Sequence, residues 1–169
     1  MEEPEVSLRE VTADTVREIC RLRVQAGQEG LVAPVAESIA EAHFAPKAWF
    51  RAVYAGDTPV GFVMLHDDAD NRQYHLWRLL IDGTQQGKGY GRRAVELVCD
   101  HVRTRPGASE LLTSWVPGDR GPERFYRGLG FELTGEVEDG EVVARLRLAQ
   151  VGAVVRPART PGERPAAPG

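Results

Sequence analysis

The chain has 169 residues, a length that suits a single domain. Hydrophobic residues make up 42% and charged residues 27% of it, which is typical of a globular protein with a sizeable core. The formal net charge of −4 does not favour nucleic acid or an anionic membrane surface as a partner. It is compatible with a cationic small molecule.

The two cysteines do not indicate a disulfide framework or a metal site. Cys20 and Cys99 both fall in apolar helical patterns, so we expect buried free thiols. Residues 1–5 are acidic and lack the basic start of a signal peptide. No apolar stretch approaches the ~18 residues of a membrane span. We therefore expect a reduced, cytoplasmic protein.

The first half of the chain predicts one strand, two helices and then three strands. Residues 6–11 alternate between apolar and polar, as a strand does. The pairs Thr15 with Glu18 and Ser38 with Glu41 have capping-box spacing, which predicts helices that start there. Runs rich in aromatic and β-branched residues follow, and the first two read as an antiparallel hairpin. These predicted strands are residues 49–54, 60–65 and 74–81.

The second half predicts a long helix to about Arg103 and a shorter helix, with strands between and after them. The strands are residues 111–116, 131–137 and 142–148, and the short helix is 122–127. Asp139-Gly140 is a hairpin signal between the last two strands. This order predicts a mixed α/β (α+β) domain over residues 1–150. Residues 151–169 are rich in Pro, Gly and Arg, and we expect a disordered tail there.

Three glycines lie between a predicted strand and a predicted helix. Gly87, Gly89 and Gly91 would let the backbone approach an anion closely. The helix start adds unpaired N–H groups, so the segment can form a pyrophosphate cradle. A plain flexible turn is the alternative. The glycine orders of the dinucleotide fingerprint and of the P-loop are absent.

The segment Gln86-Gly87-Lys88-Gly89-Tyr90-Gly91 matches the Gln/Arg-x-x-Gly-x-Gly/Ala signature, and with its flanking strand and helix it resembles the GNAT N-acetyltransferase family. The resemblance implies the GNAT fold, a mixed, mostly antiparallel central sheet of six to seven strands flanked by helices. It also implies acetyl-CoA as cosubstrate and no metal. The strand before the loop is expected to splay from its neighbour and to pair with pantetheine. Carried over, the CoA-binding positions are Leu79, Leu80, Ile81, Gln86, Gly87, Lys88, Gly89, Tyr90, Gly91 and Arg92.

Residues 119–131 are similar to the second signature of that family. Phe125-Tyr126 and Gly130-Phe131 match it fully, whereas Asp119 stands where Asn is usual and Pro122 where Ala is usual. The resemblance implies that Asp119 and Tyr126 contact CoA. It also implies that Tyr126 protonates the leaving thiolate, a role that suits a phenol with a reference pKa of ~10.

A general base for the amine is expected on the strand before the glycine loop. Strand alternation places His75, Trp77, Leu79 and Ile81 on one face. Imidazole titrates near ~6.5, which suits a base, so His75 is the candidate. A solvent-exposed histidine, with the proton passed through water, is the alternative. Asp82 is expected to cap the turn after the strand.

The acceptor amine is predicted from a looser resemblance. Residues 56–64 and 74–82 are similar to the diamine and spermine/spermidine branch of the family. Carboxylates would hold the ammonium groups, and Glu29 and Glu41 are the candidates; Glu37, Glu138, Asp139 and Glu141 are further acidic residues to consider.

The predicted function is acetyl transfer from acetyl-CoA to a primary amine, a polyamine or diamine, by direct attack in a ternary complex. The expected partner is a small-molecule amine, with neither nucleic acid nor membrane, and the resemblance makes a homodimer an expected assembly. Three alternatives stay open. They are another amine (an aminoglycoside, an amino acid or a protein N-terminus), a non-catalytic CoA-binding sensor, and a structural module whose glycines form an ordinary turn.

Overall fold

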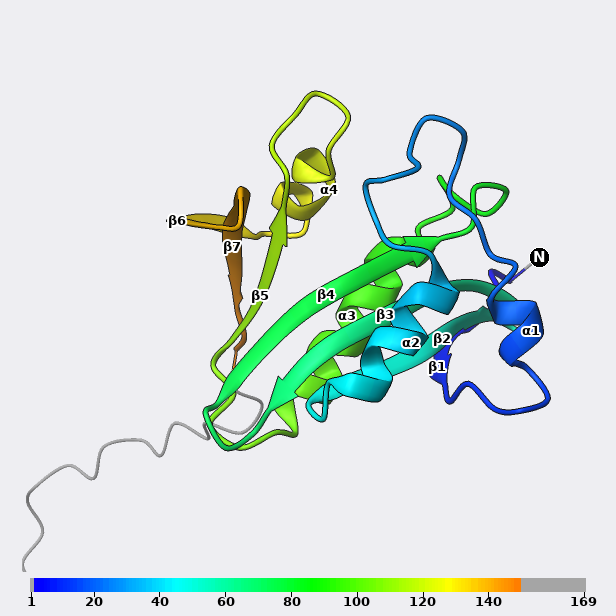
Figure 1. Cartoon of the computed structure of the whole chain (residues 1–169), viewed down its shortest axis with the longest axis horizontal. Helices are drawn as coiled ribbons and strands as arrows, with labels where there is room; N and C mark the ends of the chain where they lie inside the picture. Colours follow the sequence, from blue (N-terminus) through cyan, green and yellow to red (C-terminus); the bar gives the residue numbers. More distant parts are fainter. Residues whose placement is uncertain (1, 150–169) are drawn as a thin grey trace, which may run out of the picture.

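The structure, a computed structural model, describes residues 2–149. The predicted tail at residues 151–169 lies outside the described residues. Within them the chain alternates strands and helices around one sheet (Figure 1).

A seven-stranded sheet with the order β1-β2-β3-β4-β5-β7-β6 forms the centre of the domain. All neighbouring strands pair antiparallel except β4 and β5, which are parallel. The predicted mixed, mostly antiparallel sheet is therefore confirmed. The strands are β1 (Val6–Arg9), β2 (Ala48–Ala55), β3 (Thr58–Asp68), β4 (Gln73–Ile81), β5 (Glu110–Trp115), β6 (Glu132–Glu138) and β7 (Glu141–Arg147).

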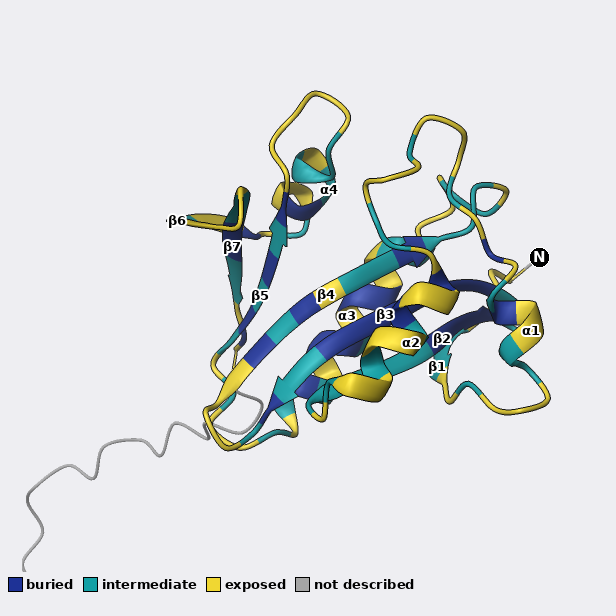
Figure 2. Cartoon of the chain, viewed as in Figure 1, coloured by how far each residue is buried: buried dark blue, intermediate teal, exposed yellow. Residues whose placement is uncertain are grey.

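Helices cover both faces of the sheet. Helices α1 (Val16–Ile19) and α2 (Val35–Phe44) lie on one face, α3 (Tyr90–Arg103) lies on the other, and α4 (Glu123–Gly128) follows β5 (Figure 1). Each face has its own apolar cluster, one built with α3 and one with α1 and α2. Buried residues accordingly line the middle of the sheet in Figure 2, with the exposed residues outside.

Helix α3 is anchored by residues spaced three to four apart. Ala94, Val95, Val98, Cys99 and Val102 are all buried against the sheet, which places one apolar stripe along the helix. Burial of apolar area is the main stabilising term of such a contact. Both cysteines are free; Cys99 is buried as predicted, whereas Cys20 is only half-buried.

The helix start predicted at Thr15 is confirmed, because Thr15 is the N-cap of α1, but its side chain does not cap the helix. The Thr15 hydroxyl instead accepts a hydrogen bond from the Thr12 N–H, 2.9 Å away, in the turn before α1. The start predicted at Ser38 is wrong: helix α2 begins at Val35, directly after Pro34, and Ser38 is fully buried inside it.

The predicted hairpin between the last two strands is confirmed. β6 ends at Glu138 and β7 begins at Glu141, so Asp139 and Gly140 form a two-residue turn. Both have a positive φ, +50° and +84°, as the tight hairpin turn requires.

Candidate active site

A cleft opens where the parallel strands β4 and β5 diverge. The two strands pair only at His75 with Leu112 and at Leu76 with Thr113. Beyond Leu76, β4 continues to pair with β3 while β5 turns away from it (Figure 1). The resulting cleft has a volume of about 1290 Å³ and is lined by β4, β5, the loop before α3, α4 and the β6–β7 turn.

A β-bulge in β4 decides which of its side chains face the cleft. Leu65 of β3 pairs with Leu76, but Met64 pairs with Arg78, so Trp77 is an extra residue. The bulge resets the alternation of faces. Leu76 and Leu79 therefore pack on the α3 side of the sheet.

The prediction that His75 shares a face with Leu79 and Ile81 is wrong, because the bulge lies between them. His75 is paired with His66, and its neighbours Tyr74 and Leu76 both pack on the α3 side, so strand alternation places His75 on the opposite face. His75, Leu79 and Ile81 still line the cleft. Leu80 does not: its side chain is buried with Phe62 in the α1–α2 cluster.

The glycine loop presents the start of α3 to the cleft. Gly87 and Gly89 have φ values of +76° and +83°, which side chains rarely tolerate, and Gly89 is the N-cap of the helix. The first backbone hydrogen bond of α3 joins the Arg93 N–H to the Gly89 carbonyl over 3.1 Å. The N–H groups before Arg93 precede that bond, so they can bind an anion.

Polar contacts fix this loop to the segment before α2. The Gln86 amide nitrogen donates to the Ile81 carbonyl at 3.0 Å and to Gln28 Oε1 at 2.8 Å. The Asp82 carboxylate accepts from the Arg23 N–H at 3.0 Å and from the Thr84 hydroxyl at 2.6 Å. The predicted role of Asp82 in the turn is confirmed, and the two rims of the cleft are tied together.

Four arginines line the cleft: Arg78, Arg92, Arg120 and Arg124. The Arg92 guanidinium also donates to the Gly128 carbonyl, 3.2 Å away. Positive side chains beside a helix start suit a phosphate-bearing ligand. The residues present therefore fit the pyrophosphate of CoA.

Tyr126 lies in the wall of the cleft. Its ring stacks on Trp115, with 5.5 Å between centroids, and meets Phe125 and Phe131 edge to face. Burial raises the pKa of its hydroxyl to about 12, and the Thr113 hydroxyl acts in the opposite direction. The hydroxyl therefore keeps its proton at neutral pH and can donate it.

His75 lies across the cleft floor in a different environment. Burial lowers the pKa of its imidazole, His66 lowers it further, and Glu141 opposes both. Its Nε2 lies 3.3 Å from Ser114 Oγ, and that hydroxyl donates to Glu141 Oε2 over 2.6 Å. A neutral imidazole of this kind can accept a proton.

A sequence profile of the acetyltransferase (GNAT) family matches residues 16–131. The chain belongs to the GNAT acetyltransferase family. Its enzyme class is that of an acetyl-CoA-dependent N-acetyltransferase. The match spans β4, the glycine loop and the Tyr126 segment, all of which line the cleft.

Individual relatives agree with this GNAT assignment. The chain is 27% identical to a spermine/spermidine N(1)-acetyltransferase of Bacillus subtilis, over 82% of this chain and 95% of that protein. A GNAT-family structure from Desulfovibrio desulfuricans superposes with a TM-score of 0.68 at 20% identity, covering 86% of this chain and all of that chain. PaiA N-acetyltransferase from Thermoplasma acidophilum, solved with coenzyme A, superposes with a TM-score of 0.63 at 15% identity, covering 85% and 99%.

Most of the predicted CoA positions of this GNAT domain line the cleft: Leu79, Ile81, Gln86, Gly87, Gly89, Tyr90, Gly91, Arg92 and Tyr126. Lys88 and Asp119 are not among the lining residues, and Lys88 Nζ instead bonds Gln85 Oε1 over 2.9 Å. Sequence reasoning did not single out Ser114. Arg120 and Arg124 lie inside the second motif, and that was the only signal for them.

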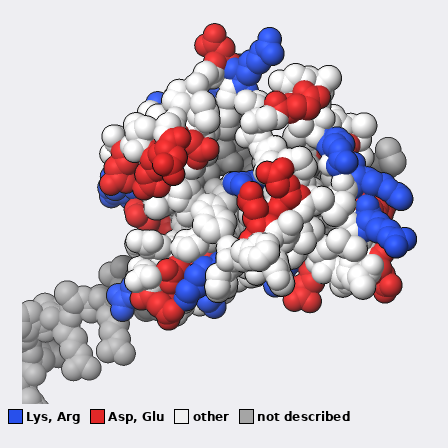
Figure 3. All heavy atoms as spheres, in the orientation of Figure 1, with Lys and Arg blue, Asp and Glu red and all other residues white. Residues whose placement is uncertain are grey.

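Acidic residues also line the cleft. Glu138, Asp139 and Glu141 come from the β6–β7 hairpin. In Figure 3, acidic side chains gather on both sides of a hollow in this face of the molecule. Glu41 also lines the cleft, but its carboxylate pairs with the Arg78 guanidinium at 3.0 Å, so its charge is already matched.

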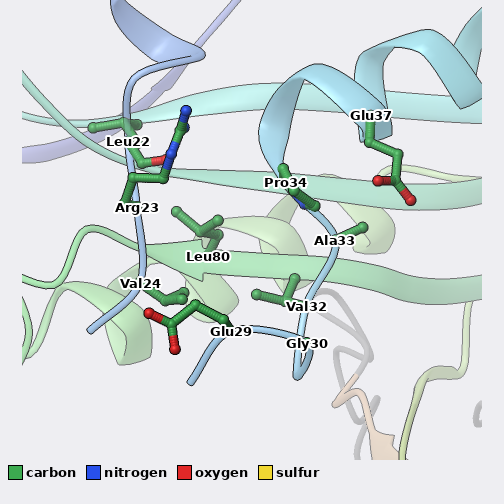
Figure 4. Close-up of a pocket in the computed structure, with 10 residues that line it drawn as sticks. All are labelled: Leu22, Arg23, Val24, Glu29, Gly30, Val32, Ala33, Pro34, Glu37 and Leu80. Carbon is green, nitrogen blue, oxygen red and sulfur yellow. The ribbon is translucent and has the colours of Figure 1, made fainter. Parts of the chain in front are cut away.

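Glu29, the other predicted ammonium ligand, lies in a neighbouring pocket of about 400 Å³. Figure 4 shows its carboxylate beside the apolar side chains of Val24 and Val32, with Glu37 on α2 further along. One Glu29 oxygen accepts the Gly27 N–H over 2.6 Å. The pocket shares Val24, Gly30, Val32 and Ala33 with the cleft, so Glu29 is at the edge of the acceptor region rather than at its centre.

Within residues 2–149, no helix combines the length and the apolar character needed to cross a membrane. In the same part of the chain, no group of three or more His, Cys, Asp and Glu side chains is arranged to hold a metal ion.

Proposed function

We propose that this enzyme acetylates a primary amine of a polyamine or diamine, by direct attack in a ternary complex with acetyl-CoA. The observation that carries the proposal is that groups of both charges line one cleft. Arg92, Arg120 and Arg124 suit the anionic cosubstrate. The carboxylates of the β6–β7 hairpin suit a chain with several ammonium groups. The 27% identity to a spermine/spermidine acetyltransferase points the same way.

Acetyl-CoA supplies an activated thioester, whose carbonyl carbon forms a bond to the amine nitrogen while its bond to sulfur breaks. His75 and Tyr126 then each carry out one of the two proton transfers. Neutral His75 takes the proton that the acceptor ammonium must lose to become nucleophilic. Protonated Tyr126 gives a proton to the departing sulfur. Because both partners bind in one cleft, no covalent intermediate on the protein is required.

The acidic hairpin provides the test of the acceptor class. The double variant Glu138→Gln/Asp139→Asn should raise the KM for spermidine about fivefold, since two exposed carboxylates each contribute roughly 0.2–1 kcal/mol to an ion pair. The KM for butylamine, which has one ammonium group, should change less than about twofold. Steady-state kinetics at saturating acetyl-CoA measures both.

A matched control is Glu132→Gln/Glu136→Gln, which removes two exposed carboxylates from β6 that do not line the cleft. It should leave both KM values unchanged. Equal KM changes for spermidine and butylamine in the test variant would count against a polyamine acceptor, and would favour an amine with a single charge.

A further inference from the structure

A chain of hydrogen bonds links three strands at the floor of the cleft. His75 of β4 meets the Ser114 hydroxyl of β5 at 3.3 Å, and Ser114 meets the Glu141 carboxylate of β7 at 2.6 Å. All three side chains line the cleft and all are half-buried. They come from separate strands, so the sheet itself sets their spacing.

The chemistry of the three groups fixes the direction of the chain. A carboxylate at neutral pH accepts hydrogen bonds and donates none, so the single hydroxyl proton of Ser114 goes to Glu141. Ser114 Oγ can then only accept from the imidazole, which means that His75 Nε2 carries the hydrogen. A neutral imidazole has one N–H, so Nδ1 keeps the free lone pair. Among residues 2–149, the side-chain hydrogen bond of His75 is made by Nε2 and not by Nδ1.

We propose that Ser114 and Glu141 are positioning residues that hold His75 in the Nε2–H tautomer and so make Nδ1 the nitrogen that receives the proton of the acceptor amine. This inference rests on the proposed role of His75. In the step, R–NH3+ gives one proton to Nδ1, leaving R–NH2 and an imidazolium. Glu141 then stabilises the imidazolium through Ser114.

Other charged groups also face His75. The residues His66, His75, Leu112 and Arg145 stand in register across four strands, so their side chains share one face of the sheet. His66 disfavours an imidazolium at His75, and Glu141 favours it. On β4 itself, the charge of Arg78 is matched by Glu41. Glu141 is the carboxylate that is joined to His75 through Ser114, and it opposes the effect of His66.

The tautomer can be measured without any turnover. Nitrogen-15 NMR of histidine-labelled protein, at a pH where His75 is neutral, should show a protonated Nε2 and a bare Nδ1. Ser114→Ala should give a mixture of tautomers, because the acceptor for Nε2–H is gone. Ser114→Thr keeps a hydroxyl and should restore the single tautomer. Glu136→Gln removes a carboxylate from the same hairpin, outside the cleft, and should change nothing.

Steady-state kinetics then distinguishes the role of Ser114 from that of Glu141. Ser114→Ala should lower kcat about tenfold with KM within about twofold, and Ser114→Thr should recover most of kcat. Glu141→Gln removes the charge that favours the imidazolium, so the acidic limb of the kcat profile should move to lower pH by about half a unit. A single Nε2–H tautomer in Ser114→Ala, or an unmoved acidic limb in Glu141→Gln, would overturn the proposal. Failure of the proposed function can be distinguished from failure of this inference, because the unaltered enzyme would then show no amine-dependent thiol release.

Discussion

Two side chains in the cleft have environments that drive their pKa values apart. Burial keeps the Tyr126 hydroxyl protonated, while burial and His66 keep the His75 imidazole neutral. Separated pKa values of this kind identify the acid and the base of a reaction that runs near neutral pH. Both groups line one cleft, so each is available to the same substrate pair.

Replacement of Tyr126 by Phe tests the acid. Tyr126→Phe should lower kcat about 100-fold, because a general acid contributes roughly 10²–10⁴-fold. The acetyl-CoA Kd, measured by calorimetry, should stay within about twofold, since the hydroxyl acts mainly in the transition state. Tyr54→Phe removes a hydroxyl from a buried tyrosine outside the cleft and serves as the control. An unchanged kcat in Tyr126→Phe would remove this residue from the mechanism.

His66, which is paired with His75 across β3 and β4, provides a test of the base. His66 lowers the pKa of His75, so His66→Gln should raise that pKa. The base is active when neutral, and the acidic limb of kcat/KM should therefore move to higher pH, opposite to the shift expected for Glu141→Gln. The exposed His43 on α2 supplies the control, His43→Gln, which should leave the pH profile in place. If the acidic limb of kcat/KM stays in place in His66→Gln, a group other than His75 titrates there.

At the residue scale, motifs predicted the site residues that belong to one short stretch of the sequence. Gly87, Gly89 and Tyr126 were found because each sits in a short signature with its own chemistry. The face of the sheet on which His75 lies was not predicted correctly, because the bulge at Trp77 depends on how β3 pairs with β4. Ser114 gave no signal, since a serine in a strand has no pattern until β4, β5 and β7 are brought together.

The strand–loop–helix unit from β4 to α3 holds the cosubstrate side of the cleft. Gly89→Val places a β-branched side chain at a φ of +83°, which costs about 1–2 kcal/mol of stability. It also projects at the anion-binding N–H groups, so the acetyl-CoA Kd should rise at least tenfold, by about 1.4 kcal/mol or more. Gly135→Val, at a φ of +90° in β6, imposes a similar strain outside the cleft.

In this pair of variants, thermal unfolding and calorimetry report stability and affinity separately. Gly135→Val should lose stability and keep its acetyl-CoA affinity. Normal affinity in a folded Gly89→Val variant would mean that CoA does not use this loop.

At the element scale, hydrophobic periodicity predicted the strands and the long helix well. The stripe from Ala94 to Val102 is a strong signal because the helix packs one face on the sheet. The boundaries of the helices were harder to predict, and α2 begins at Val35 rather than at Ser38. Helix α1 ends at Ile19, and the chain after it is held by the bond of the Arg23 N–H to Asp82. A contact 59 residues away cannot be seen in a local window.

At the scale of the whole molecule, one topological feature creates the site. A single parallel pair, β4 with β5, sits in an otherwise antiparallel sheet and separates after two paired residues. The mixed, mostly antiparallel sheet was expected from the family resemblance and not from periodicity, because local patterns do not say which strands pair. The order of the strands in the sheet was not predicted. The presence of arginines and carboxylates in one cleft likewise appears only when the fold brings the β6–β7 hairpin and the start of α3 to the same cleft.

The most direct test is amine-dependent thiol release from acetyl-CoA, with spermine, spermidine, a short diamine and butylamine supplied separately. We expect saturable release with the polyamines, an acetylated product by mass spectrometry, and kcat/KM for spermidine about tenfold above that for butylamine. Release that no amine raises above the amine-free rate, from protein that binds acetyl-CoA, would contradict the account and identify a CoA-binding protein without transferase activity.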